Sequence, residues 1–198
     1  TFTQTGAHLM SLSAHKINGP KGIGALVFDK AQLNQPLIVG GGHERGFRAG
    51  TENVAAIVGF GAAAELLQET LEQRMQQMKQ LTEYLITELV QMEGVDVIAP
   101  QAHKIPNTIM ISIPGVTGEA MVLSLDQQGI AVSSGSACGA NRQQPSHVLS
   151  AIGLPKEQHQ QVLRISVGGQ NTLDEVKQFC RIFAGQLGNR AQFADLAW

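Results

Sequence analysis

The chain has 198 residues, enough for one large domain or two small ones with a buried core. Fourteen basic and sixteen acidic side chains give a net charge of −2 without a run of five like charges. This composition predicts a soluble globular protein and argues against nucleic acid as a partner. The longest apolar runs fall well short of the roughly 20 residues that span a bilayer, so we expect no membrane crossing.

The N-terminus and the two cysteines bear on the cellular compartment in which the protein is expected. Residues 1–6 contain no cationic region followed by an apolar stretch, which is not the pattern of a secretory signal. Cys138 and Cys180 form no CxxC pair, and this disfavours both a disulfide framework and a zinc site. We therefore expect a cytoplasmic protein without a metal site.

The first part of the chain contains two short strand patterns around a lysine. Residues 8–13 alternate loosely and residues 24–28 form an apolar run, so both are predicted to be buried strands, with Lys16 in the turn between them. Residues 33–50 are rich in glycine and predict a long loop. The charged residues of this loop are either solvated or close over a pocket; they are His43, Glu44, Arg45 and Arg48.

Leucine and methionine residues recur every three or four positions in the next segment and predict an amphipathic helix over about 51–91. Gly59 and Gly61 weaken its first third, so one bent helix and two helices both agree with the pattern. We expect three parts: residues 1–60 with the glycine-rich loop, a connecting helix over 61–93, and a small C-terminal α/β domain over 94–198 that carries Cys138.

The remaining sequence alternates between strand and helix patterns, which predicts that this C-terminal α/β domain is compact. Strands are predicted at 95–98, 108–113, 130–133 and 162–167. Helices are predicted at 118–128, at 146–152 and from Thr172 onward. Thr172 and Glu175 have the spacing of a capping box at the start of the last helix.

Lys16 has neighbours that suit a Schiff-base lysine. A lysine amine near its reference pKa of about 10.4 is a poor nucleophile at neutral pH, so this role needs a partly desolvated or cationic setting. A turn between two buried strands provides burial, and Ser13 and His15 offer donors to a phosphate. On spacing alone, a solvated turn lysine beside a core histidine is still favoured over this role.

Two further residues are candidates for chemistry. Cys138 lies among small residues between Gly135 and Gly139, where a ligand can approach its sulfur, but such a cysteine is as often a buried filler as a nucleophile. Arg164 lies in the middle of a strand pattern, where it either holds a substrate carboxylate or faces solvent from an edge strand. Cys180 is expected in the core, on the apolar side of the last helix.

Four stretches, taken together and in order, resemble the cysteine desulfurase family in its NifS/IscS-like branch, one of the class V aminotransferases. They are Leu9-Met10-Ser11-Leu12-Ser13-Ala14-His15-Lys16 with Gly19-Pro20-Lys21-Gly22-Ile23-Gly24, Gly40-Gly41-Gly42-His43-Glu44-Arg45-Gly46 with Arg48-Ala49-Gly50-Thr51, Ser133-Ser134-Gly135-Ser136-Ala137-Cys138, and Leu163-Arg164-Ile165-Ser166. The Ser-Gly-Ser-Ala-Cys form separates this branch from the SufS-like enzymes. The resemblance implies an α/β fold that is the C-terminal part of a fold-type I, aspartate aminotransferase-like enzyme.

The resemblance also implies a cofactor, pyridoxal 5'-phosphate. Lys16 would form the Schiff base with it, and Ser13 and His15 would bind its phosphate. Thr51 would reach the phosphate bound by the partner subunit, which implies a homodimer with shared sites.

The implied reaction converts L-cysteine to L-alanine. Arg164 would hold the carboxylate of L-cysteine, and Cys138 would attack the substrate sulfur and become a persulfide. That sulfur would pass to an acceptor such as an iron–sulfur scaffold protein. A selenocysteine lyase or a relative that acts on cysteine sulfinate is the alternative within the enzymes.

Part of the family's pocket has no counterpart in this sequence. Family members carry, before the lysine, a histidine stacked on the cofactor ring, an aspartate paired with its pyridine nitrogen and a turn that binds the phosphate. Here only fifteen residues precede Lys16, and no carboxylate comes before Asp29. We therefore expect the chain alone to be incomplete and inactive, with the remainder supplied by a companion chain or a longer polypeptide. A non-catalytic fragment that acts as a binding module is the alternative outside the enzymes.

Overall fold

The structure is a computed structural model that describes residues 2–29, 35–135 and 146–188. It divides into two compact units, Thr1–Glu72 and Gln73–Trp198, and the border between them lies inside helix α1 (Val54–Leu89). Each unit is described by itself below. The division into residues 1–60, 61–93 and 94–198 stays a prediction.

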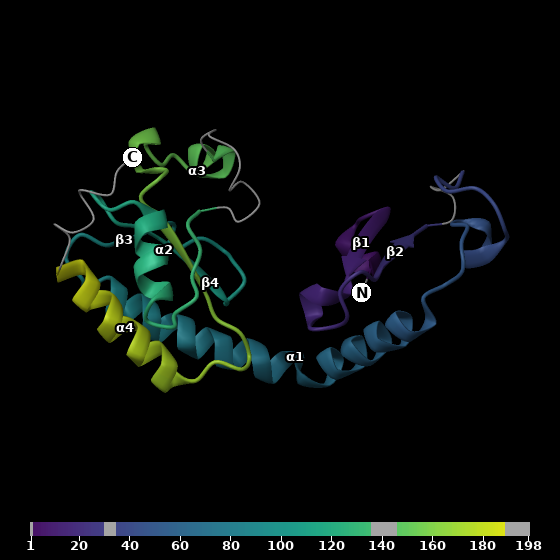
Figure 1. Cartoon of the computed structure of the whole chain (residues 1–198), viewed down its shortest axis with the longest axis horizontal. Helices are drawn as coiled ribbons and strands as arrows, with labels where there is room; N and C mark the ends of the chain where they lie inside the picture. Colours follow the sequence, from purple (N-terminus) through teal and green to yellow (C-terminus); the bar gives the residue numbers. More distant parts are fainter. Residues whose placement is uncertain (1, 30–34, 136–145, 189–198) are drawn as a thin grey trace. The chain divides into compact units, whose positions relative to one another are not determined.

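Two antiparallel strands, β1 (Leu9–Ser13) and β2 (Gly24–Phe28), form the sheet of the first unit (Figure 1). Between them the short 3-10 helix η2 (Ala14–Ile17) carries Lys16. The predicted pair of strands around a lysine turn is therefore confirmed. Described residues 35–50 form the predicted loop, apart from the 3-10 helix η4 (His43–Gly46). Another 3-10 helix, η1 (Phe2–Thr5), precedes β1.

The prediction that these two strands are buried is wrong. Leu9, Leu12 and Leu26 are 47%, 40% and 48% exposed. Ala14 is the one fully buried side chain among the described residues of the first unit. The reason is that a two-stranded sheet has two apolar faces and too little material to cover them. The first unit therefore has almost no core of its own.

Helix α1 is a single uninterrupted element, in spite of Gly59 and Gly61. At its start the Asn53 side chain accepts a hydrogen bond from the amide of Ala56, at 3.2 Å. After its end the chain turns at Gly94, whose φ is 72°. By length and composition α1 is also long and apolar enough to cross a membrane. This is weak evidence, because core helices of soluble proteins pass the same test, and the absence of a membrane span stays a prediction.

The second unit is built on a three-stranded antiparallel sheet with the order β3-β4-β5. Its strands are β3 (Asp96–Val97), β4 (Thr108–Ser112) and β5 (Val162–Ser166). Its helices are α2 (Gly118–Asp126), α3 (His147–Ala151) and α4 (Leu173–Gly188), with the 3-10 helix η6 (Lys156–Gln158) before β5. These elements confirm the predicted α/β character of this part of the chain.

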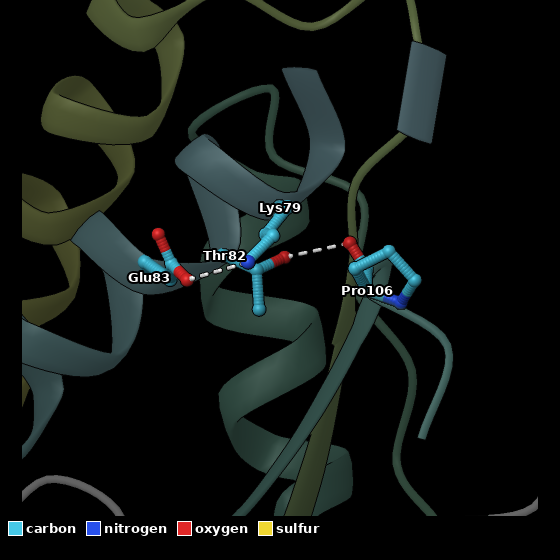
Figure 2. A network of polar contacts seen from close by, with 4 residues as sticks. All are labelled: Lys79, Thr82, Glu83 and Pro106. Carbon is cyan, nitrogen blue, oxygen red and sulfur yellow. Dashed lines mark hydrogen bonds and ion pairs between the residues drawn. The ribbon is translucent and has the colours of Figure 1, made fainter. Parts of the chain in front are cut away.

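One face of this sheet carries the core. Ile109 pairs with Ile165 and Ile111 with Leu163, and all four side chains are buried. Leucines of the last turns of α1 and apolar residues of α2 and α4 complete the cluster. The Thr82 hydroxyl of α1 donates to the Pro106 carbonyl at 3.1 Å, next to the exposed Lys79–Glu83 ion pair (Figure 2).

The capping box of α4 is confirmed. The amide of Thr172 donates to the Glu175 carboxylate at 2.7 Å, and the amide of Glu175 donates back to the Thr172 hydroxyl at 3.3 Å. Hydrogen bonds from the Thr172 amide and the Asn171 side chain lower the pKa of Glu175.

The predicted strand at 130–133 is wrong. Only Ser133 pairs with β5, as an isolated bridge to Arg164. Residues 128–132 instead line a cavity of about 340 Å³ against the end of β5 and the first turns of α4. Gly129, with φ 74°, and the hydrogen bond from the Ile130 amide to the Leu125 carbonyl turn this segment at the end of α2. The apolar alternation of the segment therefore reflects packing around the cavity and not strand pairing.

Candidate active-site residues

The turn that carries Lys16 is closed by backbone hydrogen bonds. Ser13 has extended backbone at the end of β1, and the amide of Ala14 donates to the Ile23 carbonyl at 3.1 Å. The amide of Gly19 donates to the Ala14 carbonyl at 2.9 Å, and Asn18 between them is left-handed, with φ 65°. Ala14 is fully buried. The backbone on both sides of Lys16 is therefore fixed by named contacts.

Three candidate residues from this turn lie together. Ser13, His15 and Lys16 are all exposed, and none of their side chains has a hydrogen bond or ion pair within the described part of the chain. The expectation that the strand-turn setting buries Lys16 is wrong, because the described residues cover β1 and β2 only in part. A hydroxyl, an imidazole and an amine are thus presented on one turn, free to meet an anionic ligand.

The glycine-rich loop contains strained backbone. Glu44 and Arg45 in η4 have φ values of 50° and 58°, and Gly46 follows with φ 83°. Two consecutive left-handed residues that are not glycine are costly and are found mostly where function demands them. His43 Nδ1 is buried and has no hydrogen-bond partner among the residues described. The side chains of Glu44 and Arg45 are exposed.

Thr51 lies between this loop and α1 and is exposed. Next to it, backbone amides of Glu52 itself and of Glu44, with the charges of His43 and Arg48, hold the pKa of Glu52 below its usual value. The Arg48 guanidinium donates to the Gly50 carbonyl at 3.2 Å. The end of the loop is therefore tied to the start of α1 by local contacts.

Arg164 lies in the middle of β5, opposite Met110 of β4. Side chains alternate across a strand, so Arg164 points to the face opposite the buried Leu163 and Ile165. It is half-buried, and its guanidinium makes no hydrogen bond or ion pair with any described residue. Such a cation is expensive to bury unless an anion joins it.

Ser133 pairs with Arg164 through backbone hydrogen bonds and precedes Cys138 in the sequence. The amide of Ser133 donates to the Arg164 carbonyl at 3.1 Å, and the amide of Arg164 donates to the Ser133 carbonyl at 2.6 Å. Five peptide steps separate Ser133 from Cys138, a span of at most about 18 Å. Cys138 itself lies outside the described residues. The structure thus brings Arg164 to the base of the segment that carries the candidate nucleophile.

Cys180 has the environment of a core residue, as predicted. It is 4% exposed on α4, within the hydrophobic core of the second unit. Burial, with a smaller contribution from the charge of Glu88, raises the pKa of its thiol to about 11. A thiol with this pKa is almost entirely protonated at neutral pH and is a poor nucleophile.

Two contacts of the candidate site were missed from the sequence. Gly59 was considered only as a weak point of the helix, whereas it lies against Pro20 of the lysine turn. The sequence feature that could have indicated this contact is the pair of small residues Gly59 and Ala63, which lie four positions apart on one helix face. Ser133 was assigned to a regular strand, and no local pattern distinguishes a single bridge from a strand.

Comparison with known proteins assigns a family and a fold. The aminotransferase class-V family matches residues 1–179. The chain is 41% identical to a cysteine desulfurase IscS from Dictyoglomus turgidum over 87% of its length, and 38% identical to cysteine desulfurase IscS 1 from Archaeoglobus fulgidus over 91%. A solved NifS-like protein from Rickettsia africae superposes with a TM-score of 0.84 at 32% identity and covers 96% of the chain.

These relatives are longer than the chain. The matches cover 44% of the Dictyoglomus protein, 47% of the Archaeoglobus protein and 49% of the Rickettsia structure. The chain therefore spans slightly less than half the length of the proteins it matches.

Proposed function

Because this chain belongs to the aminotransferase class-V family, we propose that it is the C-terminal part of a pyridoxal phosphate-dependent cysteine desulfurase. Its fold is the C-terminal part of a fold-type I enzyme, as the sequence predicted. The similarity to the NifS/IscS-like branch is likewise confirmed. The substrate we assign is L-cysteine and the products are L-alanine and transferable sulfur.

The observation that carries this proposal is the position of Arg164. A half-buried guanidinium without a partner among the described residues lies beside Ser133, where the segment leading to Cys138 begins. A planar guanidinium matches a carboxylate with two parallel hydrogen bonds. Arg164 would therefore orient the amino acid substrate, with its sulfur left for Cys138.

The exposed groups of the lysine turn fit the proposed cofactor. Pyridoxal phosphate needs a lysine amine for its aldehyde and several donors for its phosphate, and Lys16, Ser13 and His15 offer these groups on one turn. Thr51 would add a donor to the phosphate site of the partner subunit in a homodimer. When bound, the cofactor supplies an electron sink for cleavage at the substrate.

Cys138 would take the sulfur by nucleophilic attack on the substrate thiol. The carbon–sulfur bond of L-cysteine breaks and a sulfur–sulfur bond forms, so that sulfur is oxidised and carbon is reduced. The carbon takes up a proton to give L-alanine, and Cys138 is left as a persulfide. The transferable sulfur then goes to an acceptor thiol, such as one on an iron–sulfur scaffold protein.

We infer that the chain needs a further polypeptide segment to be active. The support is the exposure of leucine side chains on both strands of the first unit. That segment would cover β1 and β2 and complete the pocket around Lys16. We place the assembled enzyme in the cytoplasm.

The assignment is tested with Cys138→Ala in the full-length enzyme. Alanine release from L-cysteine should fall by at least about 1000-fold, because the nucleophile is removed. Cys180→Ala is the matched control and should keep near wild-type activity, since its thiol is buried in the core. Undiminished alanine release by Cys138→Ala would contradict the role of the thiol.

The same variant separates the alternatives. Selenocysteine and cysteine sulfinate depend less on an attacking thiol, so a relative dedicated to either substrate would keep that activity in Cys138→Ala. A full-length protein that gains no absorbance band on addition of pyridoxal phosphate, yet still binds a sulfur acceptor, would instead be a binding module.

A further inference from the structure

The lysine turn packs tightly on one face of α1. A Cβ atom placed on Gly59 would lie 2.7 Å from Pro20 Cγ and 3.3 Å from Pro20 Cδ. Real Cβ atoms essentially never approach another heavy atom below 3.0 Å. The proline ring is tied to the backbone at both ends, so Cγ can shift only by a change of ring pucker and Cδ stays bonded to the amide nitrogen. A side chain at position 59 therefore requires the Pro20 ring to change its pucker or the lysine turn to shift.

A second contact lies one helical turn further along α1. A Cβ atom on Gly19 would lie 3.2 Å from the Ala63 Cβ and 3.0 Å from the Ala14 carbonyl oxygen. Gly59 and Ala63 are four residues apart and thus share a helix face. Two adjacent turn residues, Gly19 and Pro20, are seated on two small residues of the same face.

These contacts bear directly on Lys16. Gly19 also donates its amide to the Ala14 carbonyl, and this bond closes the turn that contains Lys16. The Lys16 side chain is itself exposed, so its backbone position, and not side-chain packing, sets where its amine begins. A displacement of Pro20 would move this closed turn as a unit, and shifts of about 1 Å in reacting groups lower rates by about 100-fold.

We propose that Gly59 and Ala63 of α1 are positioning residues that hold the Lys16 turn in its working place. The consequence for cofactor attachment rests on the function proposed above. The packing itself does not depend on that function, and the two are measured separately.

The experiment compares four variants of the full-length enzyme. Gly59→Ala introduces the clash with Pro20. Gly61→Ala is the matched control, since its Cβ would meet nothing within 4 Å on the same helix. Gly59→Ala combined with Pro20→Ala removes both ring atoms that clash and should rescue the packing, while Pro20→Ala alone measures the effect of losing the ring.

The first readout is amide hydrogen exchange over residues 14–23. Relative to the wild-type enzyme, exchange should be about tenfold faster in Gly59→Ala and unchanged in Gly61→Ala. In the double variant, exchange should be slower than in Gly59→Ala. The second readout is pyridoxal phosphate trapped on Lys16 by borohydride and quantified by mass. The rate of trapping should follow the same order, with Gly59→Ala about tenfold slower.

The outcomes are distinct. Gly59→Ala with wild-type exchange, or a double variant no better than Gly59→Ala, would overturn the packing role. Faster exchange with an unchanged rate of trapping would overturn the positioning of Lys16. If the wild-type enzyme never carries pyridoxal phosphate on Lys16, the proposed function fails, while the exchange data still decide the packing.

Discussion

Arg164 and Cys180 are polar groups of the second unit in two different settings, the first half-buried and the second buried. The guanidinium of Arg164 faces away from the core and keeps an unused set of donors, whereas the thiol of Cys180 is enclosed by apolar side chains. An unpartnered half-buried cation is costly, and a neutral buried thiol is not. Arg164 therefore fits the ligand-binding role proposed for it, whereas Cys180 serves packing.

Cys180 should make the free energy of unfolding depend on pH in the alkaline range. Its folded pKa of about 11 lies above the usual 9.0, so between these values the folded state keeps a proton that the unfolded state releases. The free energy of unfolding should therefore be unaffected below about pH 8 and should fall above pH 9, by at most about 1.4 kcal/mol per pH unit from this group.

Urea unfolding of the chain followed by circular dichroism between pH 8 and 11 measures this effect. Cys180→Ala should lower stability by a roughly constant cavity cost of about 1 to 2 kcal/mol below pH 8. Its deficit relative to wild type should shrink above pH 9, because it has no thiol to titrate. A deficit that stays constant to pH 11 would show that the Cys180 thiol does not titrate as its burial requires.

At the scale of elements, Gly118 is a tight junction between α2 and β5 in the second unit. It begins α2, and its amide donates to the Gln160 carbonyl at 2.7 Å. A Cβ atom there would run into the Val162 carbonyl oxygen and lie 3.2 Å from the Ser134 Cβ. Val162 is held in β5 opposite Ser112, so its carbonyl has little freedom to move.

Gly118→Ala should therefore destabilise the protein by about 1 to 3 kcal/mol, although alanine favours helices over glycine. Gly185→Ala in α4 is the control, since its Cβ would meet nothing within 4 Å, and it should stabilise by up to about 1 kcal/mol. Thermal unfolding measures both. A Gly118→Ala protein as stable as Gly185→Ala would mean that β5 and α2 adjust to the added methyl group.

Helices and strands were predictable where the sequence pattern that specifies them is local. The strands beside Lys16, the helix through Gly59 and the capping box of Thr172 follow from apolar periodicity, turn residues and cap spacing. The burial of β1 and β2 was not predictable, because burial depends on what covers a strand and not on its own pattern. The same holds for residues 130–133, whose alternation fits cavity walls as well as a strand.

The sequence motifs single out the residue types of the candidate site, whereas the contacts that support the site were not predictable. Lys16, Cys138 and Arg164 were selected by the motifs around them, and their roles stay predictions. The contact of Gly59 with Pro20 joins residues almost forty positions apart, and spacing within one element carries no information about such an approach. The bridge of Ser133 to Arg164 was not predictable for the same reason, because it also joins residues far apart in the sequence.

At the scale of the whole molecule, the two units differ in how much core they contain. The second unit holds the buried cluster, and the first holds only Ala14 among its described residues. Stability rises with buried apolar area, so protection against local opening should be uneven along the chain.

In the chain alone, amides of β1 and β2 should exchange at least about 100-fold faster than those of β4 and β5. Hydrogen exchange read by mass spectrometry measures both segments in one sample. The full-length enzyme is the control, where β1 and β2 should become protected by the further segment proposed above. Equal protection of both strand pairs in the chain alone would refute the uneven distribution of core.

The open edges of β1 and β2 also have a consequence for solubility. Leucines are exposed on these strands, and the outer edge of each strand has no strand partner among the described residues. Such edges are templates for aggregation. The chain by itself should therefore aggregate at a lower concentration than a protein in which another segment covers these edges.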